Sequence, residues 1–174
     1  MLRMYLLVLG GLSALLLIPL CGQIAPGVPG TTIVNASAYV HNGSTEMTDI
    51  GASDTTITAF TNSVASSGMA WDGGNDVVTV TNPGVYLILF QMSFNGTGNS
   101  TYTCHAFKGG STELAQMDST RKIAAGGDIG SAGLMGIVTL AASDTVEVKC
   151  AGDTVGDDLT PQDATFTLLR IAGA

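Results

Sequence analysis

The sequence predicts an all-β protein, a sandwich or barrel of short antiparallel strands. From residue 33 onward, short apolar stretches alternate with clusters of Gly, Asn, Asp and Pro, which is the spacing typical of such folds. Only 11% of the 174 residues are charged, and surface helices need more Glu, Lys and Arg than this. Helical periodicity of useful length is absent outside the N-terminal segment.

The chain is expected to divide into a hydrophobic N-terminal segment (1–23), a linker (24–32) and one domain (33–174). Residues 5–20 are almost uninterrupted apolar sequence and follow Arg3, which is the layout of a secretory signal peptide. The stretch is shorter than the roughly 20 residues of a membrane span. Two interpretations stay open: a cleaved signal peptide, or a retained anchor or assembly arm. The linker follows from its two prolines and two glycines, which stop helices and central strands.

Nine stretches of the domain have the length and composition of strands, and turn residues separate them. One of them follows the turn signal Asn82-Pro83-Gly84 and is apolar on both of its faces. The expected strands are residues 33–41, 56–62, 76–81, 85–94, 101–107, 113–117, 133–141, 145–151 and 164–172.

The strands are of two kinds, and the difference predicts an oligomer. Residues 145–151 alternate between apolar and polar, as expected when one face of a sheet meets solvent. Residues 85–94, 133–141 and 164–172 carry apolar side chains on both faces, so their second face needs a partner. The predicted core includes Tyr86, Ile88, Phe90, Phe166, Val146 and Val148, and the predicted self-association face comprises Val85, Leu87, Leu89, Met135, Ile137, Leu169 and Ile171.

Charge and motif content argue against nucleic-acid binding and catalysis. The 14 acidic and 6 basic residues give a net charge of −8, and the basic residues are scattered, so phosphate binding is disfavoured. His41 and His105 are the only histidines, and no Gly-x-Ser-x-Gly motif accompanies them. We therefore expect no enzyme. Trp71, the single tryptophan, is expected in the core or at an interface.

We expect no cofactor and no bound metal, with calcium as the minority alternative. The acidic loops 72–76 and 153–158 could supply the six to eight oxygens that calcium takes, but neither has the EF-hand spacing. Solvated acidic turns are the preferred interpretation. A zinc site at the cysteines is not expected, because no Cys-x-x-Cys or paired His accompanies them.

Four sequence motifs, in order, resemble the globular heads of the tumour necrosis factor and first complement component (subunit q) superfamily. NPGVYLI at 82–88 is similar to the Pro-Gly-x-Tyr strand opening of that superfamily, and TCHAFKGG at 103–110 is similar to its strand with a Lys-Asn-Gly-type turn. GIVTLAASDTVEV at 136–148 is similar to its Leu-x-x-Gly-Asp-x-Val-x-Val segment, with Ser143 in place of the glycine. ATFTLL at 164–169 looks like the closing strand.

The resemblance implies a ten-stranded, two-sheet jelly-roll sandwich that forms tight homotrimers and is usually non-enzymatic. Members are displayed on stalks, fibres, spikes or secreted collagens, but the collagen stalk has no counterpart here. The resemblance also places the strands of Cys104 and Cys150 side by side, with both cysteines in phase with inward residues. A cross-strand disulfide and two buried thiols are both compatible with that placement.

Two functions fit these expectations. The first is a homotrimeric virion structural protein, either a capsid decoration or cement protein or the head of a spike or fibre. Its partners would be itself, capsid or spike and fibre proteins, and a host surface receptor or glycan. The alternative is a secreted or surface-anchored trimeric ligand-binding or adhesion protein of a cell, with its signal peptide removed.

Overall fold

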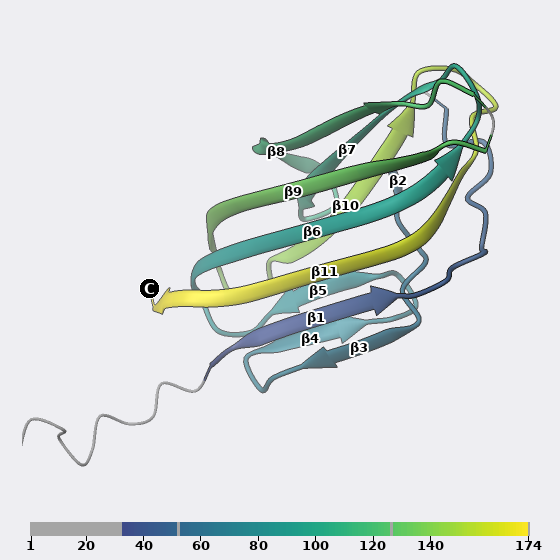
Figure 1. The fold of residues 1–174 in the computed structure, drawn as a ribbon. Helices are drawn as coiled ribbons and strands as arrows, with labels where there is room; N and C mark the ends of the chain where they lie inside the picture. Colours follow the sequence, from purple (N-terminus) through teal and green to yellow (C-terminus); the bar gives the residue numbers. More distant parts are fainter. Residues whose placement is uncertain (1–32, 52, 126, 174) are drawn as a thin grey trace, which may run out of the picture. The chain divides into compact units, whose positions relative to one another are not determined.

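The computed structural model describes residues 33–51, 53–125 and 127–173, which fold as a sandwich of two antiparallel sheets (Figure 1). The predictions for residues 1–32, including Cys21, lie outside the described residues. The strands are β1 (Asn35–Val40), β2 (Thr55–Thr56), β3 (Asn62–Ala65), β4 (Met69–Asp72), β5 (Val77–Val80), β6 (Gly84–Gly96), β7 (Thr101–Lys108), β8 (Thr112–Lys122), β9 (Ile129–Leu140), β10 (Thr145–Gly152) and β11 (Leu159–Gly173).

The two sheets have five strands each in their main paths. Sheet A has the order β3-β1-β11-β6-β9, and sheet B has the order β4-β5-β10-β7-β8, with the two-residue strand β2 pairing to β10. The chain passes repeatedly between the sheets, from β5 to β6, from β8 to β9 and from β10 to β11. This is the jelly-roll connectivity, and the ten-stranded two-sheet sandwich expected from the sequence is confirmed.

The core lies between the sheets and is built from the inward residues of the long strands. Along β6, every second side chain from Tyr86 to Phe94 points inward, and each is at most 3% exposed. Burying side chains of this size stabilises the fold by about 1.5–3 kcal/mol each. The six core residues predicted from the sequence are all buried: Tyr86, Ile88, Phe90, Val146, Val148 and Phe166.

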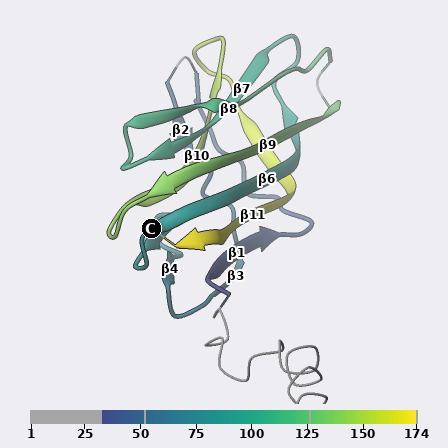
Figure 2. The same cartoon turned by 90° about the vertical axis from the view of Figure 1, so that its left-hand side faces the viewer.

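The sandwich closes along one edge where β8 of sheet B lies beside β9 of sheet A (Figure 2). The Ser119 hydroxyl accepts a hydrogen bond from the Gly133 backbone N–H at 3.3 Å across this edge. Glycine is required at Gly136, because a Cβ there would overlap the side chain of Met117. The edge strands of the two sheets therefore protect each other from pairing with other chains.

Several strands are longer than expected, among them β8, β9 and β11, and the stretch 56–62 differs most from its prediction. Residues 56–62 were predicted as a continuous strand, but only Thr55–Thr56 pairs with β10, and the next strand, β3, begins at Asn62. Between them, the buried Ile57 and Ala59 point into the core from an irregular segment. The Ile57 backbone N–H still donates a 2.9 Å hydrogen bond to the Val148 carbonyl of β10, and the pairing ends there. The strand β4 was not predicted.

Candidate functional site

The outer face of sheet A carries a continuous group of apolar side chains. Leu87 of β6 lies in register between Leu169 of β11 and Ile137 of β9. One pair further along β6, Leu89 lies opposite Met135 of β9. Side chains alternate between the two faces along a strand, so the odd-numbered residues of both β6 and β9 lie on the outer face and form these cross-strand pairs. We call the set of Val85, Leu87, Leu89, Met135, Ile137, Leu169 and Ile171 the apolar face.

Water reaches much of the apolar face in a single chain. Met135 is 69% exposed and Ile137 is 59% exposed, although both lie on a long, regular strand. Leu89 and Ile171 are also exposed, whereas Val85, Leu87 and Leu169 are half-buried by their neighbours. The structure thus brings together all seven residues that the sequence assigned to self-association. A contiguous exposed apolar group of this kind is typical of an interaction surface.

Beyond Leu89 the same sheet face is hollow, with polar and apolar residues in its lining. A pocket of about 600 Å³ lies over β1, β6, β9 and β11, and its lining includes Gln91, Ser93 and Ser131. At its rim, the Nδ1 atom of His41 lies 2.7 Å from a carboxylate oxygen of Asp163. This hydrogen bond, with the backbone N–H of Asn42, lowers the pKa of the Asp163 carboxyl. The pocket was not predicted from the sequence.

The arrangement at the pocket does not match a nucleophilic catalytic site. The Nε2 atom of His41 is 3.0 Å from the side-chain amide nitrogen of Asn42, so both ring nitrogens have partners. The other histidine, His105, is bonded to the carboxylate of Asp118. In the described part of the chain, neither histidine is hydrogen-bonded to a hydroxyl or thiol that it could activate.

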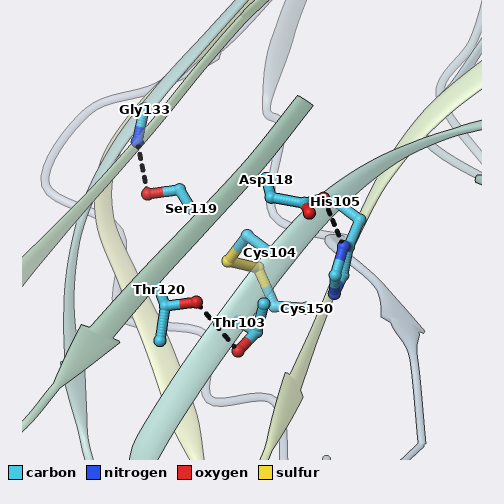
Figure 3. Close-up of a disulfide and its surroundings, with 8 residues drawn as sticks. All are labelled: Thr103, Cys104, His105, Asp118, Ser119, Thr120, Gly133 and Cys150. Carbon is cyan, nitrogen blue, oxygen red and sulfur yellow. Dashed lines mark hydrogen bonds and ion pairs between the residues drawn. A yellow bond between two sulfur atoms is a disulfide. The ribbon is translucent and has the colours of Figure 1, made fainter. Parts of the chain in front are cut away.

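A disulfide joins Cys104 of β7 and Cys150 of β10 (Figure 3). The two residues lie directly opposite each other in the ladder, with a Cα–Cα distance of 4.0 Å. Both side chains point into the core and are almost completely buried. Of the two arrangements left open by the sequence, the structure contains the disulfide.

The outer face of sheet B is less open to solvent than its alternating sequence indicates. Glu147 was expected to face water, but it is only 7% exposed because Thr56 of β2 covers it and donates a 2.6 Å hydrogen bond to its carboxylate. Lys149 lies over the ring of Phe107, with Nζ 4.8 Å from the ring centroid, and donates a 2.6 Å hydrogen bond to the Gly110 carbonyl. Other parts of the same chain thus cover Glu147 and Phe107 on this face, whereas β8 stays largely exposed.

Carboxylates of the two acidic loops accept hydrogen bonds from within the loops and from neighbouring segments. Asp72 accepts hydrogen bonds from the Gly74 backbone and the Asn75 side chain, and these bonds lower the pKa of Asp72. Asp157 accepts from the Ser100 hydroxyl and from the Thr154 backbone. These contacts are those of ordinary structured turns.

Asp76 and Trp71 lie near the edge of sheet B where β4 and β5 pair. Asp76 is buried, and burial raises its pKa to about 6, against the lowering effect of the Phe60 backbone N–H. Trp71 is half-buried and packs against Phe60 and Phe166, with ring centroids 5.5 and 6.2 Å away. It packs against the core cluster from the edge of the sandwich.

Residues 33–51, 53–125 and 127–173 contain no helix that is long and apolar enough to cross a membrane.

The fold and the bare apolar face together define a two-sheet jelly-roll head, and comparison with solved structures specifies its type. The chain is similar to Eiger TNF from S. frugiperda, with a TM-score of 0.56 and 15% identity over 82% of this chain and 94% of that chain. It is similar to murine APRIL at pH 5.0, with a TM-score of 0.53 and 16% identity over 79% of this chain and 99% of that chain. The fold is therefore a tumour necrosis factor-like jelly roll, as the sequence motifs indicated. No protein-family model and no curated protein match the sequence.

Proposed function

We propose that this chain is a non-enzymatic head domain that assembles into a homotrimer through the apolar face of sheet A. The observation that carries the proposal is the exposure of Met135 and Ile137 in the middle of β9, a long strand hydrogen-bonded to β6. Burying such side chains at an interface stabilises an assembly by about 25 cal/mol per Å² of apolar area. A single chain does not gain this free energy. The number of subunits comes from the superfamily that the sequence motifs resemble. A closed ring uses the same face of every subunit and leaves none of them bare.

The setting that we propose for the trimer is a virion, as a capsid decoration or cement protein or as the head of a spike or fibre. The proposed self-association face supports a structural role, and among the described residues the histidines are bonded to carboxylate and amide groups and not to a nucleophile. The net charge of −8 argues against packaging nucleic acid and favours protein partners. Those partners are further copies of the chain, capsid or spike and fibre proteins, and a host surface receptor or glycan.

One observation favours the second candidate, a secreted or surface-anchored ligand-binding or adhesion trimer of a cell. Disulfides form and persist in oxidising compartments and are rare in the cytosol, and Cys104 and Cys150 are joined by one. A chain exported by a signal peptide meets that requirement during its synthesis.

Sedimentation tests the trimer, and mass spectrometry separates the two settings. Residues 33–174 form a compact unit, and we expect them to sediment at three times the monomer mass. A stable monomer at micromolar concentration contradicts the trimer. For the settings, the N-terminus of the mature native protein decides: retention of Met1 supports the assembly arm of a virion protein, whereas cleavage near Cys21 supports the secreted protein.

A further inference from the structure

A histidine and two carboxylates converge on the outer face of sheet B, on the side of the sandwich opposite the apolar face. His105 lies on β7, and Glu113 and Asp118 lie on β8, the next strand of the sheet. Figure 3 shows the His105 and Asp118 side chains pointing toward each other close to the disulfide. This cluster has no part in the assembly proposed above.

An irregularity in the β7–β8 ladder brings the three residues together. Phe107 pairs with Glu113, but His105 pairs with Asp118, so the register shifts between the two pairs. In an unbroken antiparallel ladder, only one of the two carboxylates would lie near His105. Between the two pairs β8 has four residues (114–117) where β7 has one, and both carboxylates reach the same imidazole. Bulges commonly serve to redirect side chains in this way.

The three side chains lie close enough together for one ion to reach all of them. The His105 Nδ1 atom is 2.7 Å from an Asp118 oxygen and 3.4 Å from a Glu113 oxygen. One ligand atom from each residue lies within 4.8 Å of the other two. Zinc bonds of about 2.0–2.2 Å place tetrahedral ligands roughly 3.3 Å apart, so the cluster closes on an ion with small side-chain rotations.

The charges around the cluster also suit a cation. In the described ranges of the chain, Glu113 and Asp118 form ion pairs with His105 and with no lysine or arginine. Lys149 lies opposite His105 in the ladder, but its ammonium group is bound to Gly110 and lies 3.7 Å from Glu147. The two carboxylates are about half exposed, so an ion can reach them from solvent and keep water ligands.

We propose that His105, Glu113 and Asp118 bind a divalent transition-metal ion, with zinc as the best match to one imidazole and two carboxylates. The ion joins two strands that are otherwise linked by an irregular ladder, and thereby fixes the β7–β8 hairpin. The sequence argument against zinc concerned the cysteines and paired histidines. The ligands of the proposed site come together only through the irregular β7–β8 ladder.

Calorimetric titration of the full-length chain with zinc chloride tests the site. We expect one zinc ion per chain, and we expect His105→Ala, Glu113→Gln and Asp118→Asn each to weaken binding by more than roughly 10-fold. The two carboxylate variants change exposed side chains, so they should melt at the temperature of the metal-free parent.

Two controls make the result specific. His41 is bonded to one carboxylate, that of Asp163, at the same 2.7 Å distance, so His41→Ala should leave zinc binding unchanged. Cys21→Ser should do the same, which excludes binding by that thiol. The site is contradicted if the parent binds no zinc, or if His41→Ala or Cys21→Ser weakens binding as much as His105→Ala does.

Discussion

The outer faces of the two sheets differ in what covers them. On sheet B, polar and aromatic side chains are covered by the same chain: Thr56 lies over Glu147, and Lys149 lies over Phe107. On sheet A, Met135 and Ile137 are largely exposed, and no other described segment covers them. A chain can cover one sheet by itself and leave the other to a second molecule. The proposed assembly through sheet A rests on this difference.

The strongest test of this difference places an aspartate on each outer face in turn. Leu89→Asp or Ile137→Asp should dissociate the trimer into folded monomers, because a buried unpaired charge costs about 3–5 kcal/mol. Analytical ultracentrifugation, with circular dichroism as the check of folding, measures the outcome. Ala115→Asp, at an exposed position on β8 of sheet B, is the matched control and should stay trimeric. A trimer of folded Leu89→Asp would show that assembly uses another surface.

The second test removes the disulfide of sheet B. Among the described residues, sheet A has no such covalent link. Replacing Cys104 and Cys150 together by alanine should lower the free energy of unfolding by up to about 4 kcal/mol, because the bridge closes a loop across a sequence separation of 46 residues. Urea unfolding with and without reductant measures the loss. The reductant should destabilise the parent protein and leave the double variant unchanged. Assembly should persist at native conditions, since the apolar face is untouched.

A third test compares one buried tyrosine from each sheet. The Tyr102 hydroxyl of sheet B accepts a hydrogen bond from Thr97 at 2.7 Å and donates one to Asp158 at 2.6 Å, whereas the Tyr86 hydroxyl of sheet A donates one to Asn82. Removing a buried partner costs about 1–3 kcal/mol. Tyr102→Phe should therefore cost about 2–3 kcal/mol and Tyr86→Phe about 1 kcal/mol in urea unfolding. Equal losses would contradict the assignment of two partners to Tyr102.

The smallest expected effect concerns Asp76, a buried carboxyl at the edge of sheet B. One of its oxygens has no hydrogen-bond partner among the described residues, and its pKa is raised from 3.8 to about 6. The folded chain therefore holds a proton between pH 4 and 6 that the unfolded chain releases, so stability falls as pH rises through this range.

Asp76→Asn should remove this loss and stabilise the protein at pH 7.5 by about 1–2 kcal/mol. Asparagine keeps the shape of the side chain and tolerates the positive φ of 54° at this position. Thermal unfolding at pH 4.5 and 7.5 measures the difference between variant and parent. Some carboxyls have lowered pKa values and make stability rise with pH instead: Asp72, Asp153 and Asp163. Parent and variant share these residues, so their effect cancels in the comparison. If variant and parent differ in stability by the same amount at pH 4.5 and at pH 7.5, the raised pKa of Asp76 is contradicted.

The sequence predicted that three strands of sheet A belong together, because the hydrophobic pattern of a strand indicates which of its faces avoid water. Residues 85–94, 133–141 and 164–172 were grouped by their two apolar faces, and β6, β9 and β11 all lie in sheet A. The pattern failed for β3 and β4. Every residue of β3 is exposed, so no alternation marks it, and its strand conformation depends on pairing with β1.

Features that depend on register and on loop placement could not be predicted. Glu147 alternates like a solvent-facing residue, and only the position of the β2 segment covers it. Glu113 and Asp118 are five residues apart, a spacing that a regular strand would send to opposite faces. Their approach to His105 depends on the irregular ladder, which local sequence does not specify. The pocket beside His41 likewise forms between four strands that are distant in sequence.

The antiparallel pairing of β1 with β11 has a mechanical consequence. Asn35 pairs with Leu169 and Val40 with Ala164, so the chain enters β1 and leaves β11 at the same end of sheet A (Figure 1). Tension between these two ends would open the ladder one pair at a time. If the domain is instead held at Ile33 and pulled at the loops of the opposite end, the force runs along β1. This strand is then sheared against β11 and β3 at the same time. Many hydrogen bonds then resist at once, which suits a domain tethered at one end and grasped at the other.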